Sequence, residues 1–404
     1  MNTDIWFFLI IGFLGLLLPW LKKFEQFQII NVPMVAVVVG IFCYVLPIDL
    51  PVPDPIKYND QILKLTEITV IISIMGAGLK LNHKFSLKNY RIPLLLVGVT
   101  MIGCIISVSL LGFWIGLVPA SAILLAAVFA PTDPVLAGDV QVDIEETSEE
   151  EHPVQYNLTV EAGINDGMAF PFTWLAILVA INGFTTTEWI TDWLLFDVLY
   201  RIALGIIIGF ITGRIIAWLF FELPDRVKLA PKRLGFLAIA ITFFIYGATE
   251  AAHAYGFIAV FVSAVTIRQF EKQHEFHKEM HDVVAQVELF LITVILVFLG
   301  GYIATYQFRE LTMPLVLLSL GFILIIRPVF GLLPTIKSKI IWKERWSIAF
   351  LGIKGIGSFF YLAFALSKVD FPQKETLWDV VAFIVLLSII IHRSIGYFVK
   401  KNLP

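Results

Sequence analysis

Two polar runs interrupt an apolar stretch of the chain: Ala130-Pro131-Thr132-Asp133-Pro134-Val135 and Glu161-Ala162-Gly163-Ile164-Asn165-Asp166-Gly167. Carboxylates inside a bilayer are costly, and they usually mark an ion path or a proton relay. We therefore interpret the two runs as the centre of a functional site. The rest of the chain is then the scaffold that holds them near the middle of a membrane.

The composition supports a membrane location. Of 404 residues, 58% are hydrophobic and only 15% are charged, whereas a soluble domain has about 25% charged residues. The basic residues form no run, so the sequence predicts no nucleic-acid partner, and no organic substrate is indicated. We expect an all-α integral membrane protein, a single transmembrane transporter domain over residues 1–404 with no soluble domain and with membrane lipid around it.

Apolar windows long enough to cross a bilayer recur along the whole chain, and we count about thirteen of them. They lie near residues 5–20, 31–47, 62–79, 91–117, 119–138, 155–181, 190–221, 232–250, 254–268, 282–305, 312–335, 345–367 and 376–399. We expect windows 4–6 and 11–13, residues 91–181 and 312–399, to form the transport core. The remaining windows would supply the scaffold and a dimer interface.

Basic residues concentrate in the loops after the odd-numbered windows, as in the loop that holds Lys80, Lys84 and Lys88. The positive-inside rule then places the N-terminus outside and the C-terminus in the cytoplasm. We expect the membrane to be the cell membrane (plasma or inner membrane). The loop Asp143–Glu151 is acidic although it should be cytoplasmic. We interpret it as a solvated loop; the alternatives are that it concentrates cations at the cytoplasmic mouth or binds a regulatory cation.

The fifth window contains the first polar run. Pro131 and Pro134 remove backbone donors, which predicts a break in the helix. A proline kink without function is the simple alternative. Thr132 and Asp133 favour function, because an unwound turn with a hydroxyl, free carbonyls and a carboxylate suits a cation site.

The sixth window contains the second polar run. Glu161 and Asn165 are four residues apart and share a helical face, while Asp166 is rotated by roughly 100° from Asn165. The first two can therefore support a site into which Asp166 points. Such hard oxygen donors suit alkali cations or protons. The alternative is a buried, salt-bridged carboxylate with a structural role.

The twelfth window reads Leu351-Gly352-Ile353-Lys354-Gly355-Ile356-Gly357-Ser358, and its three glycines predict a second break. Two interrupted segments in corresponding positions indicate an inverted-repeat transporter with two crossed discontinuous helices, windows 5 and 12. Such a crossing brings helix ends together. Asp133 and Lys354 have the charges needed to neutralise those ends.

Arg327, in the eleventh window, needs a carboxylate partner inside the membrane. Glu161 is our candidate for that partner. The alternatives are Glu288 of the tenth window, or an arginine that extends to the membrane surface.

Taken together, these motifs resemble the monovalent cation/proton antiporters of the NhaP type, relatives of the mammalian sodium/proton exchangers. The resemblance covers essentially the whole chain and includes Arg327-Pro328 and the segment Gly352–Gly357. It implies that Asp166 binds the ion and exchanges the proton, that Glu161 shapes the site and that Thr132 offers oxygen ligands. Sodium would then lie at Asp166, Thr132 and Glu161. Asn165 precedes the aspartate as in electroneutral members. The resemblance also implies a homodimer, no cofactor besides the transported ions, and no enzymatic activity.

Two positions depart from the family pattern. Ala162 stands where members often have a serine, and Lys354 stands where arginine is common. Both bear on the choice between sodium and potassium.

The sequence therefore predicts electroneutral exchange of sodium (or lithium) for protons by alternating access, with potassium/proton exchange as the alternative. A cation channel lacks support because the chain has no repeated filter motif. An intramembrane hydrolase lacks support because no nucleophile or metal set is recognisable.

Overall fold

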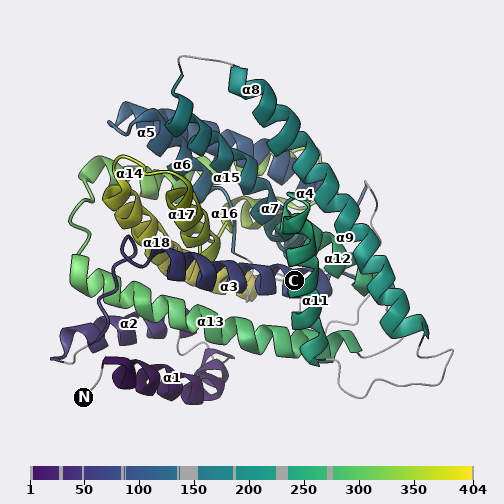
Figure 1. Ribbon diagram of the computed structural model, residues 1–404, viewed down its shortest axis with the longest axis horizontal. Coiled ribbons are helices and arrows are strands. Elements are labelled where there is room, and N and C mark those ends of the chain that lie inside the picture. The colour runs from purple at the N-terminus through teal and green to yellow at the C-terminus, as the bar shows by residue number, and fades with distance from the viewer. Residues whose placement is uncertain are drawn as a thin grey trace.

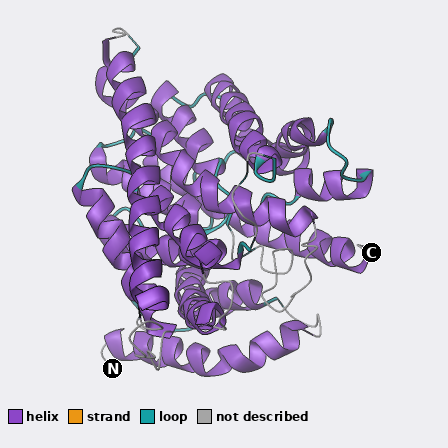
Figure 2. Cartoon of the chain, turned by 90° about the vertical axis from the view of Figure 1, so that its right-hand side faces the viewer, coloured by secondary structure: helices purple, strands orange, loops and turns teal. Residues whose placement is uncertain are grey.

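The computed structural model describes residues 3–26, 31–47, 50–82, 86, 88–133, 136, 153–184, 188–223, 235–270 and 276–402. Every regular element within these residues is a helix (Figures 1 and 2), so the predicted all-α class is confirmed. Pro134, Val135 and the acidic loop Asp143–Glu151 lie outside the described residues.

The helices follow the expected windows in chain order. The first seven windows contain α1 (Thr3–Gln26), α2 (Val32–Val45), α3 (Asn59–Lys80), α4 (Arg91–Leu95) with η1 (Leu96–Met101) and α5 (Ile102–Trp114), α6 (Pro119–Phe129), α7 (Pro153–Asn182), and α8 (Glu188–Asp192) with η3 (Trp193–Tyr200), α9 (Arg201–Ala217) and η4 (Trp218–Glu222). The last six contain α11 (Gly235–Ala251), α12 (Gly256–Phe270), α13 (Phe276–Tyr306), α14 (Met313–Gly321) with η5 (Phe322–Ile326), α15 (Arg327–Leu332) and η6 (Leu333–Thr335), α16 (Trp342–Phe350) with α17 (Ile356–Lys368), and α18 (Lys374–Asn402).

Seven helices or helix runs among the described residues are long and apolar enough to cross a membrane. They are Asn59–Lys80, Arg91–Trp114, Pro153–Asn182, Glu188–Phe220, Lys278–Tyr306, Met313–Thr335 and Lys374–His392. The protein is therefore a multi-pass membrane protein. The total of thirteen crossings stays a prediction.

Two helices are interrupted where the sequence predicts a break. In the fifth window α6 ends at Phe129, and residues 130–133 are not helical. Pro131 has no N–H to donate to the preceding turn, which explains why the helix stops there. In the twelfth window α16 ends at Phe350, α17 begins at Ile356, and residues 351–355 between them are extended or irregular. Most of the fifth window beyond residue 133 lies outside the described residues.

Burial distinguishes the centre of the bundle from its periphery. In α3, 67% of the most apolar window is buried, against 17% in the run from α8 to η4. Figure 1 agrees, with α3 in the middle of the bundle and the α8–α9 run along one edge. Because lipid replaces water around a membrane protein, the exposed apolar face of that run is the expected surface toward the bilayer.

Small residues let α13 approach α2 very closely. A Cβ atom added at Gly40 would lie 2.2 Å from the carbonyl oxygen of Val297, and one added at Gly300 would lie 2.1 Å from that of Val37. Close backbone approach through glycine is a common way for membrane helices to pack. The contact fixes α13, which in turn packs on α3 beside the site described next.

Candidate functional site

The two non-helical segments cross at the centre of the protein and bond to each other. The N–H of Asp133 donates to the carbonyl of Ile353 at 2.8 Å. Next to this bond, a Cβ atom at Gly355 would lie 2.1 Å from Oδ2 of Asp133, so only glycine fits there. On the other side, the N–H of Lys354 donates to Oγ of Ser388 in α18 at 2.8 Å. The crossing therefore consists of direct contacts between the two broken helices.

A carboxylate caps the positive helix end at this crossing. Oδ2 of Asp133 accepts the N–H of Ile356, the first residue of α17, at 2.8 Å, and its Oδ1 accepts the N–H of Leu136 at 3.0 Å. The first N–H groups of a helix lack partners within the helix and carry partial positive charge. Asp133 is buried and satisfies one of them.

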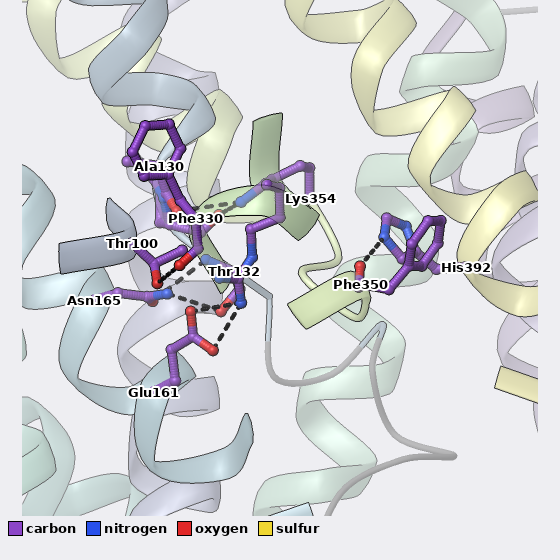
Figure 3. Close-up of polar contacts among 11 residues, drawn as sticks. Thr100, Ala130, Thr132, Glu161, Asn165, Phe330, Phe350, Lys354 and His392 are labelled. Atoms are coloured by element: carbon purple, nitrogen blue, oxygen red, sulfur yellow. Dashed lines mark hydrogen bonds and ion pairs between the residues drawn. The ribbon is translucent and has the colours of Figure 1, made fainter. Parts of the chain in front are cut away.

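The ammonium group of Lys354 lies at the opposite helix end, the C-terminus of α6. Nζ of Lys354 donates to the carbonyl oxygens of Ala130 at 3.1 Å and Pro131 at 2.9 Å, just beyond the last turn of α6 (Figure 3). It also lies 5.3 Å from the centre of the Phe322 ring. These carbonyls carry the partial negative charge of a helix C-terminus, so the sign of the Lys354 charge matches its surroundings.

Arg327 and Glu161 form a buried ion pair. Nη2 of Arg327, in α15, donates to both carboxylate oxygens of Glu161, in α7, at 2.7 and 2.8 Å, and each side chain is 4% exposed. The pairing expected from the sequence is therefore present, and Glu288 is not the partner. A Cβ atom at Gly352 would lie 2.4 Å from Nε of Arg327, so this glycine makes room for the guanidinium beside the second break.

Asn165 holds the unwound turn of the fifth window against α7. Its Nδ2 donates to Oγ1 of Thr132 at 2.8 Å, and its Oδ1 accepts the N–H of Thr132 at 3.3 Å (Figure 3). Both side chains are buried. The amide therefore supplies a donor and an acceptor to a turn that has lost its helical hydrogen bonds.

Asp166 faces a small cavity instead of a partner. Its side chain is 2% exposed and lines a cavity of about 10 Å³ together with residues of α3, α13 and both broken helices. The lining consists of Thr69, Val70, Ser73, Asp133, Asp166, Ile292, Ile356 and Gly357. Such a volume is about enough for one water molecule. Among the described residues no donor bonds to the Asp166 carboxylate, whereas the hydroxyl of Tyr361 donates to the backbone carbonyl of Asp166.

Three neighbours in α7 thus have three different surroundings. Glu161 contacts Arg327, Asn165 contacts Thr132, and Asp166 faces the cavity. Thr132 and Glu161, expected from the resemblance to be sodium ligands, do not line this cavity. No group of three or more His, Cys, Asp or Glu side chains in the described part of the chain is arranged to hold a metal ion.

Thr69 and Ser73 are lining residues that the sequence analysis did not single out. They are four residues apart on α3 and therefore share a face. A pair of hydroxyls at that spacing in a central span is the sequence signal by which they could have been found. Thr69 donates its hydroxyl to the carbonyl of Leu65 at 2.7 Å, as threonines in membrane helices often do, so the signal is weak alone.

Comparison with solved structures shows the fold. The structure of the sodium proton antiporter MjNhaP1 from Methanocaldococcus jannaschii at pH 8 matches 98% of this chain and 99% of its own, with a TM-score of 0.70 and 17% identity. The electron-microscopy structure of the same antiporter matches all of this chain and 99% of its own, with a TM-score of 0.75 and 16% identity. The inverted-repeat transporter fold predicted from the sequence is therefore confirmed.

Sequence comparison finds longer relatives. The chain is 26% identical to a Na(+)/H(+) antiporter of Saccharomyces cerevisiae over 88% of its length, and 26% identical to Na(+)/H(+) antiporter 2 of Zygosaccharomyces rouxii over 82%. It spans 40% and 44% of the lengths of these two relatives.

The family model for the transmembrane sodium/hydrogen exchangers matches residues 7–398, nearly the whole chain. The chain therefore belongs to the sodium/hydrogen exchanger family, which consists of transporters and not of enzymes.

Proposed function

We propose that this protein exchanges sodium (or lithium) for protons, one for one, by alternating access. The observation that carries the proposal is the buried Asp166 carboxylate facing a water-sized cavity where the two broken helices cross. One carboxylate in so small a space holds either a cation or a proton. Each turnover that replaces one by the other, on opposite sides of the membrane, is an exchange.

The surrounding charges support one-for-one stoichiometry. Asp133 and Glu161 are matched by Lys354 and Arg327, which donate to helix carbonyls and to Glu161. Asp166 is thus the one carboxylate of this cluster whose charge changes when a cation or proton binds. With a neutral Asn165 beside it, the loaded site has the same charge with sodium as with a proton. No cofactor is needed besides the transported ions.

The proposed sodium ligands come from both sides of the cavity. Asp166 supplies the charge, and Thr69 and Ser73, whose side chains carry hydroxyl groups, line the same cavity. We retain Thr132 and Glu161 as further ligands for states in which the transport core has moved. In the described state their side chains are bonded to Asn165 and Arg327.

We also propose how the protein sits and moves. The loop charges favour an external N-terminus and a cytoplasmic C-terminus in the cell membrane. The core elements within 91–181 and 312–399 would move against the other helices, and the scaffold would support a homodimer.

Potassium/proton exchange is the second candidate, because Ala162 offers no hydroxyl where family members often have serine. The relatives found by sequence and by structure comparison are named as sodium/proton antiporters, which favours sodium over potassium. We therefore rank sodium first.

The test uses purified protein in liposomes with a trapped pH dye and an imposed pH gradient. Sodium, lithium and potassium are added separately to wild type, to Asp166→Asn and to the surface control Glu279→Gln, with the membrane voltage clamped at zero and then released. We expect sodium and lithium to dissipate the gradient in wild type and control but not in Asp166→Asn, independently of voltage. A response to potassium alone would mean that the protein exchanges potassium, and not sodium, for protons. Full activity in Asp166→Asn, or no response to any cation, refutes the proposal.

A further inference from the structure

A further buried carboxylate, besides Asp133, Glu161 and Asp166, lies one helical turn from the cavity. Glu288 is in α13, is 8% exposed and is four residues before Ile292, which lines the cavity. Residues four apart share a helical face, so Glu288 and Ile292 point toward the same side. That side is α3: a Cβ atom at Gly76 would lie 3.8 Å from Oε2 of Glu288. The sequence analysis considered Glu288 only as a partner for Arg327, which bonds to Glu161 instead.

Ser73 connects this carboxylate to the cavity. It lines the cavity beside Asp166, and its side chain is also close enough to Glu288 to interact with it. Oγ of Ser73 is buried and makes no hydrogen bond of good geometry within the described part of the chain. A buried hydroxyl without a well-aligned hydrogen bond is unusual in a packed protein and indicates a site that a water, ion or proton donor can complete. Asp166, Ser73 and Glu288 thus form a series of oxygen-bearing groups.

Both helices place Glu288 on the cytoplasmic side of the cavity in the proposed orientation. Along α3, Ser73 is followed by Gly76 and then by Lys80 at the helix end. Along α13, Glu288 precedes Ile292 and therefore lies closer to the N-terminal end of that helix. The charged groups that act on Glu288 are Lys80, Lys22 of α1 and, from the cavity side, Asp133. The two lysines belong to loops or helix ends that the positive-inside rule assigns to the cytoplasm.

Glu288 has no structural task of the kind that Glu161 and Asp133 perform. It takes part in no ion pair among the described residues. A buried carboxylate without a cation partner is costly, and within a membrane such groups usually serve a proton or ion pathway.

We propose that Glu288 is the proton acceptor between Asp166 and the cytoplasm. When a cation enters from the cytoplasm and binds Asp166, the proton leaves Asp166, passes by way of the Ser73 hydroxyl to the Glu288 carboxylate, and goes on to cytoplasmic water. Glu288 returns to its starting state, so the exchange stays one for one. This inference rests on the proposed sodium/proton exchange.

The test separates the proton step from the cation step. Sodium/proton exchange is measured as dissipation of a pH gradient, and sodium/sodium exchange as uptake of ²²Na⁺ into sodium-loaded liposomes without a pH gradient. The variants are Glu288→Gln, Glu288→Asp, Ser73→Ala and the matched control Glu279→Gln, an exposed glutamate on the same helix.

We expect Glu288→Gln to slow sodium/proton exchange by about tenfold or more while sodium/sodium exchange stays within about twofold of wild type. Ser73→Ala should slow sodium/proton exchange and, because Ser73 also offers an oxygen to sodium, sodium/sodium exchange as well. Glu288→Asp should restore part of the sodium/proton exchange rate because it keeps a carboxylate. An equal loss of both exchanges in Glu288→Gln would mean that Glu288 supports the structure or binds the cation, and it overturns the inference. Unchanged sodium/proton exchange in Glu288→Gln overturns it too. Wild type without either exchange refutes the proposed function itself.

Discussion

The buried pair of Arg327 and Glu161 allows a quantitative prediction about stability. Glu161→Gln removes the negative charge but leaves an amide oxygen that accepts one of the two hydrogen bonds from Nη2. The guanidinium then stays buried without a counter-charge, and its Nε and Nη1 already lack hydrogen-bond partners among the described residues. Removing one partner of a buried pair costs about 3–5 kcal/mol. Because one hydrogen bond survives, we expect a loss at the lower end, about 3 kcal/mol.

The double variant Glu161→Gln/Arg327→Gln supplies the contrast. It contains no unpaired charge at this position, so it should be more stable than the sum of the two single losses implies. We expect a coupling energy of about 3 kcal/mol in the double-mutant cycle.

The free energy of unfolding is measured on purified protein in mixed micelles titrated with sodium dodecyl sulfate. Asp370→Asn is the control, since it removes a surface pair with Lys374 whose aspartate side chain is 82% exposed, and such pairs contribute about 0–1 kcal/mol. A coupling energy for Glu161 and Arg327 below about 1 kcal/mol would contradict the reasoning, because it would mean that the pair is well hydrated.

Three further predictions concern the crossing and the site. Gly355→Ala forces a Cβ atom against the Asp133 carboxylate and should lower both the melting temperature and the exchange rate. The control Gly247→Ala, whose Cβ atom meets nothing within 4 Å, should change neither. Equal effects of the two variants would contradict the close packing at Gly355. Lys354→Gln leaves two helix-end carbonyls without a cation and should destabilise the protein by about 1–3 kcal/mol, with Lys354→Arg closer to wild type. Thermal melting of the purified variants checks this. An unchanged stability of Lys354→Gln would refute the helix-end role. Protons and sodium compete for Asp166, so the apparent KM for sodium should fall as pH rises; a KM for sodium independent of pH in the liposome assay would argue against a shared carboxylate.

Local chemistry explains why both breaks were predictable from the sequence. Pro131 cannot donate to the preceding turn, and the glycines around Lys354 tolerate a chain that is not helical. These effects act within a few residues, so the sequence alone carries them. The charges of Asp133 and Lys354 were predictable in sign for the same reason. Their partners, such as the carbonyl of Ala130, depend on how two distant segments cross.

The α3 side of the cavity was not predictable in this way. Thr69 and Ser73 look like ordinary hydroxyls in a membrane helix, and Thr69 indeed bonds to its own helix. The packing of α3 against α7, α13 and α17 brings them to Asp166. Glu288 was not predictable either. Its charge made it a candidate partner for Arg327 in the sequence, whereas the fold places it beside Ser73.

The claim that Asp166 holds either sodium or a proton is tested most directly by proton release on sodium binding. Sodium chloride is added to purified protein in weakly buffered detergent solution, across a range of pH, and the released protons are measured with a pH dye against a choline chloride control. Cation binding to a protonated ligand releases its proton, so wild type should release up to about one proton per chain at the pH where the site is protonated. Asp166→Asn should release none. Equal release by wild type and Asp166→Asn, or none by wild type at any pH, would contradict the account.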